Sequence, residues 1–307
     1  MFSVRVQTLW QQPMPKEMKI SEILTNTRRS LSFEVFPPKS DSSFESVREA
    51  TERIASLSPS FMSVTYGAGG GTSKYTLAIA KEIREKYGVP SLAHLTCVSS
   101  SKETVRARIR DMKELGIENV MALRGDIPDG MEMASRDYRY AVELVKELKE
   151  AGGFCIGGAC YPEGHPESKS LDEDIFRVKE KVDSGLDFLT TQMFFDNSLY
   201  YRFLDRAEKA GINVPIVPGI MPITSVMQIE RVVALSGSFL PKEFLSMVEK
   251  YGSDPVSMKN AGIEYATRQS EGLFGYGVKN VHVYSMNKPD VARQILENLK
   301  TKSNNEK

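Results

Sequence analysis

The chain alternates short apolar segments with longer segments whose apolar positions recur at three- and four-residue steps. The short segments lie near 31–36, 61–66, 91–97, 119–125, 155–161, 188–194, 215–221 and 281–286. Between them, segments such as 43–57 and 104–116 carry one apolar face at helical spacing, as helices that cover a sheet do. The pattern therefore predicts eight strands separated by amphipathic helices.

Strands separated by helices pair in parallel through right-handed crossovers, and eight such units predict an α/β fold of the (β/α)8 TIM barrel type. An open doubly wound sheet is the structural alternative, but it would gather its polar residues at one switch point. Helix ends with short returns to the next strand are predicted at four glycines, Gly116, Gly152, Gly185 and Gly211.

Three segments depart from this rhythm. The stretch 236–280 predicts two extra helices before the last strand. Residues 1–29 form an N-terminal extension whose pattern is too weak to place, and residues 301–307 predict a frayed, disordered tail. The barrel itself is therefore expected to occupy residues 30–300.

Composition narrows the possible partners and the compartment. The 307 residues suffice for one large domain, and with 40 basic and 40 acidic residues the formal net charge is zero. No long-range field then recruits nucleic acid or an anionic membrane. The three cysteines contain no CxxC pair, the start lacks a signal-peptide region, and no run reaches the ~18 apolar residues of a membrane span. We expect a cytoplasmic protein with no nucleic-acid or membrane partner.

Polar residues recur at the C-terminal tips of the predicted strands, and a parallel barrel would bring them to one face. They are Glu34, Thr65, His94, Asp126, Tyr161, His165 and Gln192. Glu34 lies among apolar neighbours before Pro37 and Pro38, so a partly desolvated carboxyl suits a general acid. A glutamate paired with an arginine is the equal alternative. For Asp126, local spacing favours a simple turn aspartate beside Arg124.

Other motifs exclude more than they assign. The glycine-rich stretch at 67–73 lacks Rossmann and Walker spacing, which favours a plain strand-to-helix loop over a phosphate cradle. His94, His165 and His282 permit a three-histidine zinc site, but no HxH or HExxH spacing supports it, so hydrogen bonding is the favoured role and no metal is expected. The amides of Gln192 and Gln228 suit recognition of a polar heterocycle, although Gln228 equally suits a surface position.

Seven motifs in register resemble the methylenetetrahydrofolate reductase family. They are FEVFPPK, SVTYGAGGGTS, HLTC, ALRGD, YPEGHPES, TQMFFD and PGIMPI, and the resemblance covers residues 31 to about 298. It implies a flavin-binding (β/α)8 barrel that reduces 5,10-methylenetetrahydrofolate to 5-methyltetrahydrofolate, in one-carbon metabolism and methionine supply.

The resemblance also assigns roles to individual residues. Glu34 matches the family's general acid, which protonates N10 of the folate, and Asp126 matches the aspartate beside the flavin that also contacts folate. Flavin contacts are implied for Thr65, Tyr66, His94, Arg124, Gly125, Asp126, Ala141, Tyr161, His165, Ser168, Asp174 and Lys181. Folate or nicotinamide contacts are implied for Glu34, Asp126, Gln192, Gln228 and Lys288.

The implied mechanism is ping-pong, with FAD as cofactor and NADH or NADPH as electron donor. Lys288 stands where many relatives have arginine, which keeps the charge but loses the bidentate fork. Arg177 and Glu180 depart from the pattern expected on the helix that meets the distal part of the flavin nucleotide, which keeps FMN open. A homo-oligomer is expected. The alternatives are a pterin-dependent methyltransferase barrel and a subunit that receives electrons from a partner protein.

Overall fold

The structure is a computed structural model that describes residues 18–27, 29–38, 40–66, 73–127 and 136–305. Its strands are β1 Ser30–Val35, β2 Met62–Val64, β3 Ser91–Thr96, β4 Asn119–Leu123, β5 Cys155–Cys160, β6 Phe188–Thr191, β7 Ile216–Val217, β8 Gly219–Ile220 and β9 Asn280–Val283. Its helices are α1 Ile20–Asn26, α2 Phe44–Ala55, α3 Ser73–Tyr87, α4 Lys102–Glu114, α5 Ala141–Ala151, α6 Leu171–Asp183, α7 Asn197–Lys209, α8 Val226–Ser236, α9 Lys242–Tyr251, α10 Pro255–Tyr276 and α11 Pro289–Asn305.

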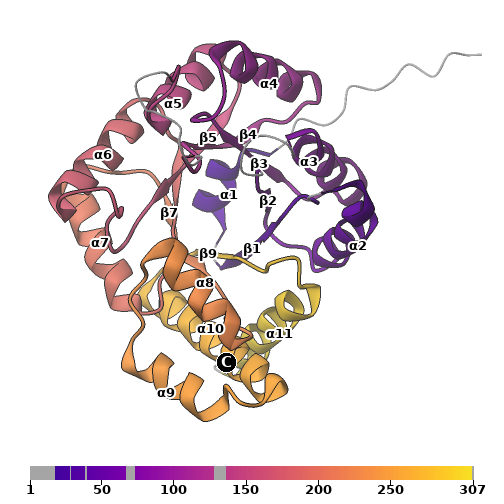
Figure 1. Cartoon of the computed structure of the whole chain (residues 1–307), viewed down its shortest axis with the longest axis vertical. Helices are drawn as coiled ribbons and strands as arrows, with labels where there is room; N and C mark the ends of the chain where they lie inside the picture. Colours follow the sequence, from indigo (N-terminus) through magenta and orange to yellow (C-terminus); the bar gives the residue numbers. More distant parts are fainter. Residues whose placement is uncertain (1–17, 28, 39, 67–72, 128–135, 306–307) are drawn as a thin grey trace, which may run out of the picture.

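The strands form one parallel sheet in the order β7-β6-β5-β4-β3-β2-β1-β9-β8. Its two ends, β7 and β8, are consecutive in the chain and separated only by Pro218, so together they are one strand. The first part pairs with β6 and the second with β9, while the Pro218 carbonyl accepts from the His282 amide at 2.9 Å. The sheet therefore closes into a barrel, as predicted, and the open doubly wound alternative is wrong (Figure 1).

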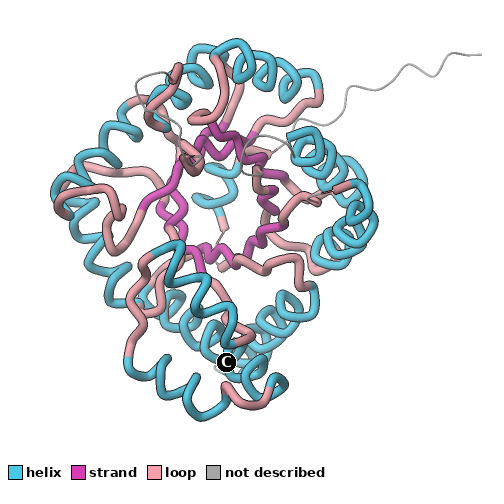
Figure 2. The backbone as a smooth tube through the Cα atoms, in the orientation of Figure 1, coloured by secondary structure: helices cyan, strands magenta, loops and turns pink. Residues whose placement is uncertain are grey.

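Helices surround the ring of strands (Figure 2). The face of α2 that was expected to cover the sheet is buried through Val47, Ile54 and Ala55, in one large cluster with the outward residues of the strands. The four glycines predicted at helix ends all adopt positive φ, between +68° and +121°. At each of these glycines the chain turns from the end of a helix toward the next strand within a few residues.

The N-terminal end of the barrel is closed by α1, which appears in the middle of the ring in Figure 1. Ile20, Ile23 and Leu24 are buried in a cluster with inward residues of the strands, including Phe188. The Asn119 side chain accepts from the Ile20 amide at 2.9 Å and donates to the Met18 carbonyl at 3.2 Å. The sequence pattern missed this position because seven residues are too short to show a helical period.

The two helices expected within 236–280 are α9 and α10, inserted between α8 and β9. The last helix, α11, continues through Asn305, so the expectation of fraying after residue 300 is wrong for 301–305. Serine and asparagine are weak helix formers, but adding residues to an existing helix costs far less than starting one. Within the described ranges, no helix combines the length and apolar character needed to span a membrane.

Candidate active site

A cavity of about 280 Å³ opens among the C-terminal halves of the barrel strands. It is lined by Glu34, Thr65, His94, Met121, Leu123, Ala159, Tyr161, Thr190, Thr191, Gln192, Met221, His282 and Tyr284. Five of the sequence-predicted site residues line it, namely Glu34, Thr65, His94, Tyr161 and Gln192. The convergence expected of strand tips is therefore confirmed for these five residues.

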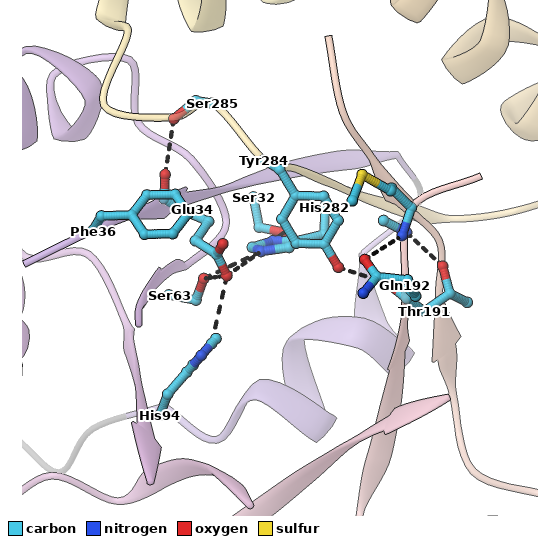
Figure 3. Close-up of polar contacts among 12 residues, drawn as sticks. Ser32, Glu34, Phe36, Ser63, His94, Thr191, Gln192, His282, Tyr284 and Ser285 are labelled. Carbon is cyan, nitrogen blue, oxygen red and sulfur yellow. Dashed lines mark hydrogen bonds and ion pairs between the residues drawn. The ribbon is translucent and has the colours of Figure 1, made fainter. Parts of the chain in front are cut away.

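Glu34 is the one carboxylate in this lining, and it is 6% exposed. Its Oε2 atom accepts from Ser63 Oγ at 3.2 Å and lies 3.6 Å from His94 Nε2 and 3.9 Å from His282 Nε2 (Figure 3). Burial lowers the pKa of His94, against the opposing effect of the Glu34 charge. Glu34 thus faces a serine and imidazoles, and the arginine partner considered from the sequence is absent from its described contacts.

His282 connects the surroundings of Glu34 with Ser32 and Phe61. Its Nδ1 lies 2.7 Å from Ser32 Oγ and its Nε2 lies 3.2 Å from Ser63 Oγ, while its ring stacks on Phe61. Both ring nitrogens therefore have hydroxyl partners, and the imidazole cannot rotate without breaking one of these bonds. The sequence placed His282 deeper than the mouth, and the structure agrees.

Tyr284 forms the wall between Glu34 and Gln192. Its hydroxyl donates to the Thr191 carbonyl at 2.6 Å, and its ring meets His282 edge-on at 5.3 Å (Figure 3). Burial raises the pKa of the phenol well above its usual range, so it stays a neutral donor. A Cβ at Gly219 would stand 2.4 Å from this hydroxyl, so only glycine leaves room for the tyrosine.

A second group of predicted residues meets at the ends of β5 and α6. Asp174 is buried and accepts from the His165 amide at 3.0 Å and from Ser168 Oγ at 3.2 Å. The His165 ring meets the Tyr161 ring edge-on at 4.7 Å. Lys181 donates to the Ala159 carbonyl at 2.6 Å, and burial lowers the pKa of its ammonium. Four of these five flavin-contact candidates, Asp174, His165, Ser168 and Tyr161, are thus linked by direct contacts.

Burial also raises the pKa of Tyr161 to about 12, so the phenol keeps its proton at neutral pH. Burial likewise lowers the pKa of His165, which favours a neutral ring. Both groups therefore offer neutral hydrogen-bonding edges to this side of the barrel mouth.

The end of β4 carries the next three candidates. Arg124 makes a bidentate ion pair with Glu167 at 2.6 and 2.7 Å. Gly125 has φ +85°, and a Cβ there would stand 2.9 Å from Thr96. Asp126 is exposed and lies outside the cavity lining, two residues before a stretch beyond the described residues. The neighbouring Arg124 is held by its ion pair with Glu167.

Three further candidates lie away from the cavity lining. Tyr66 packs against the outer core, and Ala141 begins α5. Most of the glycine-rich stretch, residues 67–72, lies outside the described residues. Gln228 Oε1 accepts from the Thr224 amide at 3.1 Å, and its Nε2 donates to the Pro222 carbonyl at 3.3 Å. The side chain therefore holds the backbone that leads into α8.

Lys288 lies close to Gln228, on the other side of Thr224. Its ammonium donates to Thr224 Oγ1 at 2.7 Å, and the same hydroxyl donates to Gln228 Oε1 at 3.3 Å. Burial lowers the pKa of Lys288. The two candidates that are separated by 60 positions in sequence are therefore joined through Thr224, beside the mouth.

The three histidines do not form a metal site. His94 and His282 flank Glu34, whereas His165 contacts Tyr161. Among the residues that the structure describes, no group of three or more His, Cys, Asp or Glu side chains is placed to hold a metal ion. His282 and His165 make hydrogen bonds and ring contacts, and His94 lies against the Glu34 carboxylate.

A model of the family "Methylenetetrahydrofolate reductase" matches residues 19–300. The chain belongs to the methylenetetrahydrofolate reductase family. The "5,10-methylenetetrahydrofolate reductase" of Pectobacterium carotovorum is 38% identical over 272 residues, which are 89% of this chain and 90% of that protein. That of Escherichia coli is 36% identical over 270 residues, covering 88% and 90%. The Arabidopsis thaliana "Methylenetetrahydrofolate reductase (NADH) 1" is 33% identical over 295 residues, covering 92% of this chain and 50% of that protein.

A solved structure shares the barrel with this reductase-family chain at a TM-score of 0.64 and 16% identity. It is described as an "Uncharacterized protein from Clostridium thermocellum binds two copies of 5-methyl-5,6,7,8-tetrahydrofolic acid", and the alignment covers 93% of this chain and 99% of that one. At this identity the likeness supports the fold alone.

Several cavity residues of this reductase-family barrel were missed at the sequence level. They are Met121, Leu123, Ala159, Thr190, Thr191, Met221 and Tyr284. Alternation along each strand could have found Thr190, which lies two residues before Gln192 and so on the same side of β6. Nothing local marks Tyr284, because its position depends on Gly219 of β8, which leaves room for its hydroxyl.

Proposed function

We propose that this protein is a flavin-dependent reductase that converts 5,10-methylenetetrahydrofolate to 5-methyltetrahydrofolate, with NADH or NADPH as the electron donor. The observation that carries the proposal is the buried Glu34 carboxylate at the wall of the barrel cavity, in a chain of this family. A general acid of the folate reaction needs such a position, close to a heterocycle and screened from bulk water.

The described residues fit a flat flavin ring. The cavity has apolar walls at Leu123, Ala159 and Met221, and its volume of about 280 Å³ matches one ring system rather than a whole dinucleotide. Tyr161 and His165 would hold the ring's edge, and Arg124 or Lys181 would have to exchange its present partner for a phosphate. FAD is the cofactor we propose, with FMN as the variant that lacks the adenylate half.

A bound flavin would supply a two-electron carrier that takes hydride from the nicotinamide and returns it to the one-carbon unit of the folate. Because a cavity of about 280 Å³ does not hold the donor and the folate together beside a flavin, the two would occupy the site in turn. This shared space supports the ping-pong order.

Glu34 would protonate N10 of the folate and so help to open the five-membered ring to the 5-iminium cation. Ser63 holds the carboxylate by a hydrogen bond at 3.2 Å, and His282 holds Ser63. Burial lowers the pKa of His94, which makes this neighbour a weaker competitor for the proton than an exposed imidazole would be. The serine and imidazole contacts therefore orient Glu34 toward the cavity.

Other chain groups would complement the charge and shape of the folate. Gln192 lines the cavity and has an amide that matches the donor and acceptor edge of a pterin. Asp126, at the end of β4, would favour the cationic intermediate through its negative charge. Lys288 would meet a carboxylate of the substrate tail after release from Thr224.

An anaerobic visible spectrum of the purified protein tests this proposal. We expect a flavin band that one nicotinamide bleaches and that 5,10-methylenetetrahydrofolate then restores. A band that ignores both NADH and NADPH but responds to a chemical reductant and the folate would assign electron delivery to a partner protein. Protein that binds no flavin after incubation with FAD or FMN would overturn the reductase proposal.

A further inference from the structure

Thr190 presents an unexplained polar group at the cavity. It is 5% exposed and lines the cavity, yet its Oγ1 is buried without a hydrogen-bond partner among the described residues. Buried hydroxyls are satisfied in most proteins, and an orphan costs free energy unless something else pairs with it. The described part of the chain therefore leaves this hydroxyl without a hydrogen-bond partner, on a residue that lines the cavity.

The strands on either side of Thr190 cannot satisfy it. In the sheet register, Thr190 stands opposite Ala159 on β5 and Val217 on β7, neither of which has a polar side chain. The apolar lining of the same cavity includes Met121 and Met221. A hydroxyl at this position adds nothing to the packing that valine would not supply, since the two side chains have the same shape.

The next residue provides a contrast within the same strand. Thr191 is completely buried, and its Oγ1 accepts from the Gly219 amide at 2.9 Å. That hydroxyl helps to hold β8 against β6 and is part of the barrel's closure. Thr190 and Thr191 are thus adjacent residues of one type, of which only the second has a structural partner.

We propose that the Thr190 hydroxyl is a ligand-binding group that hydrogen-bonds to the pyrimidine edge of the heterocycle in the cavity. A hydroxyl both donates and accepts, and it would therefore suit the alternating carbonyl and N–H groups of such a ring. Flavins and pterins share this edge, so the inference rests on the proposed function but does not depend on which of the two rings reaches Thr190. Gln192, two residues along on the same side of β6, would pair with another atom of the ring.

The test compares Thr190→Val, Thr190→Ser and Thr191→Val in the full-length protein. Flavin is removed and FAD is titrated back by fluorescence, and 5-methyltetrahydrofolate is titrated into the flavin-loaded protein. We expect Thr190→Val to weaken one of these dissociation constants by about three- to tenfold, the net value of one hydrogen bond. Thr190→Ser retains the hydroxyl and should stay close to wild type.

The ligand that responds identifies the ring: weaker FAD binding assigns Thr190 to the flavin, and weaker folate binding alone assigns it to the pterin. The melting temperature of the flavin-free protein is the second readout. Thr190→Val should leave it unchanged or raise it, whereas Thr191→Val should lower it because the Gly219 amide loses its acceptor.

Unchanged affinity for both ligands in Thr190→Val would overturn the inference, since the hydroxyl would then be paired only with cavity water. A melting temperature lowered as much as in Thr191→Val would also overturn it, because it would reveal an internal partner. Wild-type protein that binds no flavin contradicts the proposed function instead, and it is recognised before any variant is made.

Discussion

At the scale of single residues, the surroundings of Glu34, which lies on β1, come from three other strands. Ser63 lies on β2, His94 on β3 and His282 on β9. Each has a side-chain atom within 3.9 Å of Glu34 Oε2. No pair of these residues is close in sequence. The acid could therefore be suspected from its apolar flanks and its strand tip, but its partners could not.

The buried imidazole of His94 predicts a pH dependence of stability. Burial lowers its pKa in the folded protein, so below about pH 6.5 the unfolded chain takes up a proton that the folded chain resists. This contribution is fully present above the unfolded value and is lost as the pH falls toward the folded one. His94→Gln should therefore reduce the loss of unfolding free energy between about pH 7 and pH 5.5.

Urea unfolding at several pH values measures this slope. Ser63→Ala perturbs the same pocket without removing an imidazole, so it should keep the wild-type slope. An identical slope in His94→Gln would show that His94 titrates in the same way in both states.

At the scale of elements, periodicity predicted the barrel because nearly every strand residue is buried and a covering helix such as α2 buries one face. Two features of the chain were not predicted from the periodicity. Pro218 divides the seventh strand, since a proline offers no amide to the ladder and the chain changes partner there from β6 to β9. Helix α1 is too short to show a period, and its place depends on contacts with Asn119 far along the chain.

The start of α6 links helix capping to the flavin-side residues. Ser170 Oγ accepts from the Glu173 amide at 3.1 Å, and the next turn carries Asp174, which holds His165 and Ser168. Ser170→Ala should cost about 1 kcal/mol of stability and also weaken flavin binding, because Asp174 loses its fixed position.

Ser101 provides the matched control, since its Oγ caps α4 by accepting from the Thr104 amide at 3.2 Å. Ser101→Ala should cost a similar ~1 kcal/mol and leave flavin binding unchanged. Thermal unfolding and flavin titration on both variants decide the matter. Equal effects of the two substitutions on flavin affinity would show that the cap of α6 does not position the flavin-contact residues.

At the scale of the whole molecule, the barrel separates stability from chemistry. One end is filled by α1 and an apolar cluster, and the other carries Glu34 and the cavity. Ile20 is completely buried at the closed end. Ile20→Ala should lower the free energy of unfolding by about 2–5 kcal/mol, the usual cost of such a cavity.

The same variant should keep wild-type kinetic constants at temperatures well below its melting point. Denaturant unfolding and steady-state assays of folate reduction test the two statements separately. A large fall in kcat at a temperature where the variant is fully folded would show that α1 also influences the geometry of the active site.

The central claim is that Glu34 supplies the proton for the folate half-reaction and has no part in the nicotinamide half-reaction. Anaerobic stopped-flow kinetics of Glu34→Gln test it most directly, with each half-reaction followed at the flavin band. We expect flavin reduction by the nicotinamide close to the wild-type rate, and reoxidation by 5,10-methylenetetrahydrofolate slowed by about a hundredfold or more. Reoxidation at the wild-type rate in Glu34→Gln would show that Glu34 is not the proton donor.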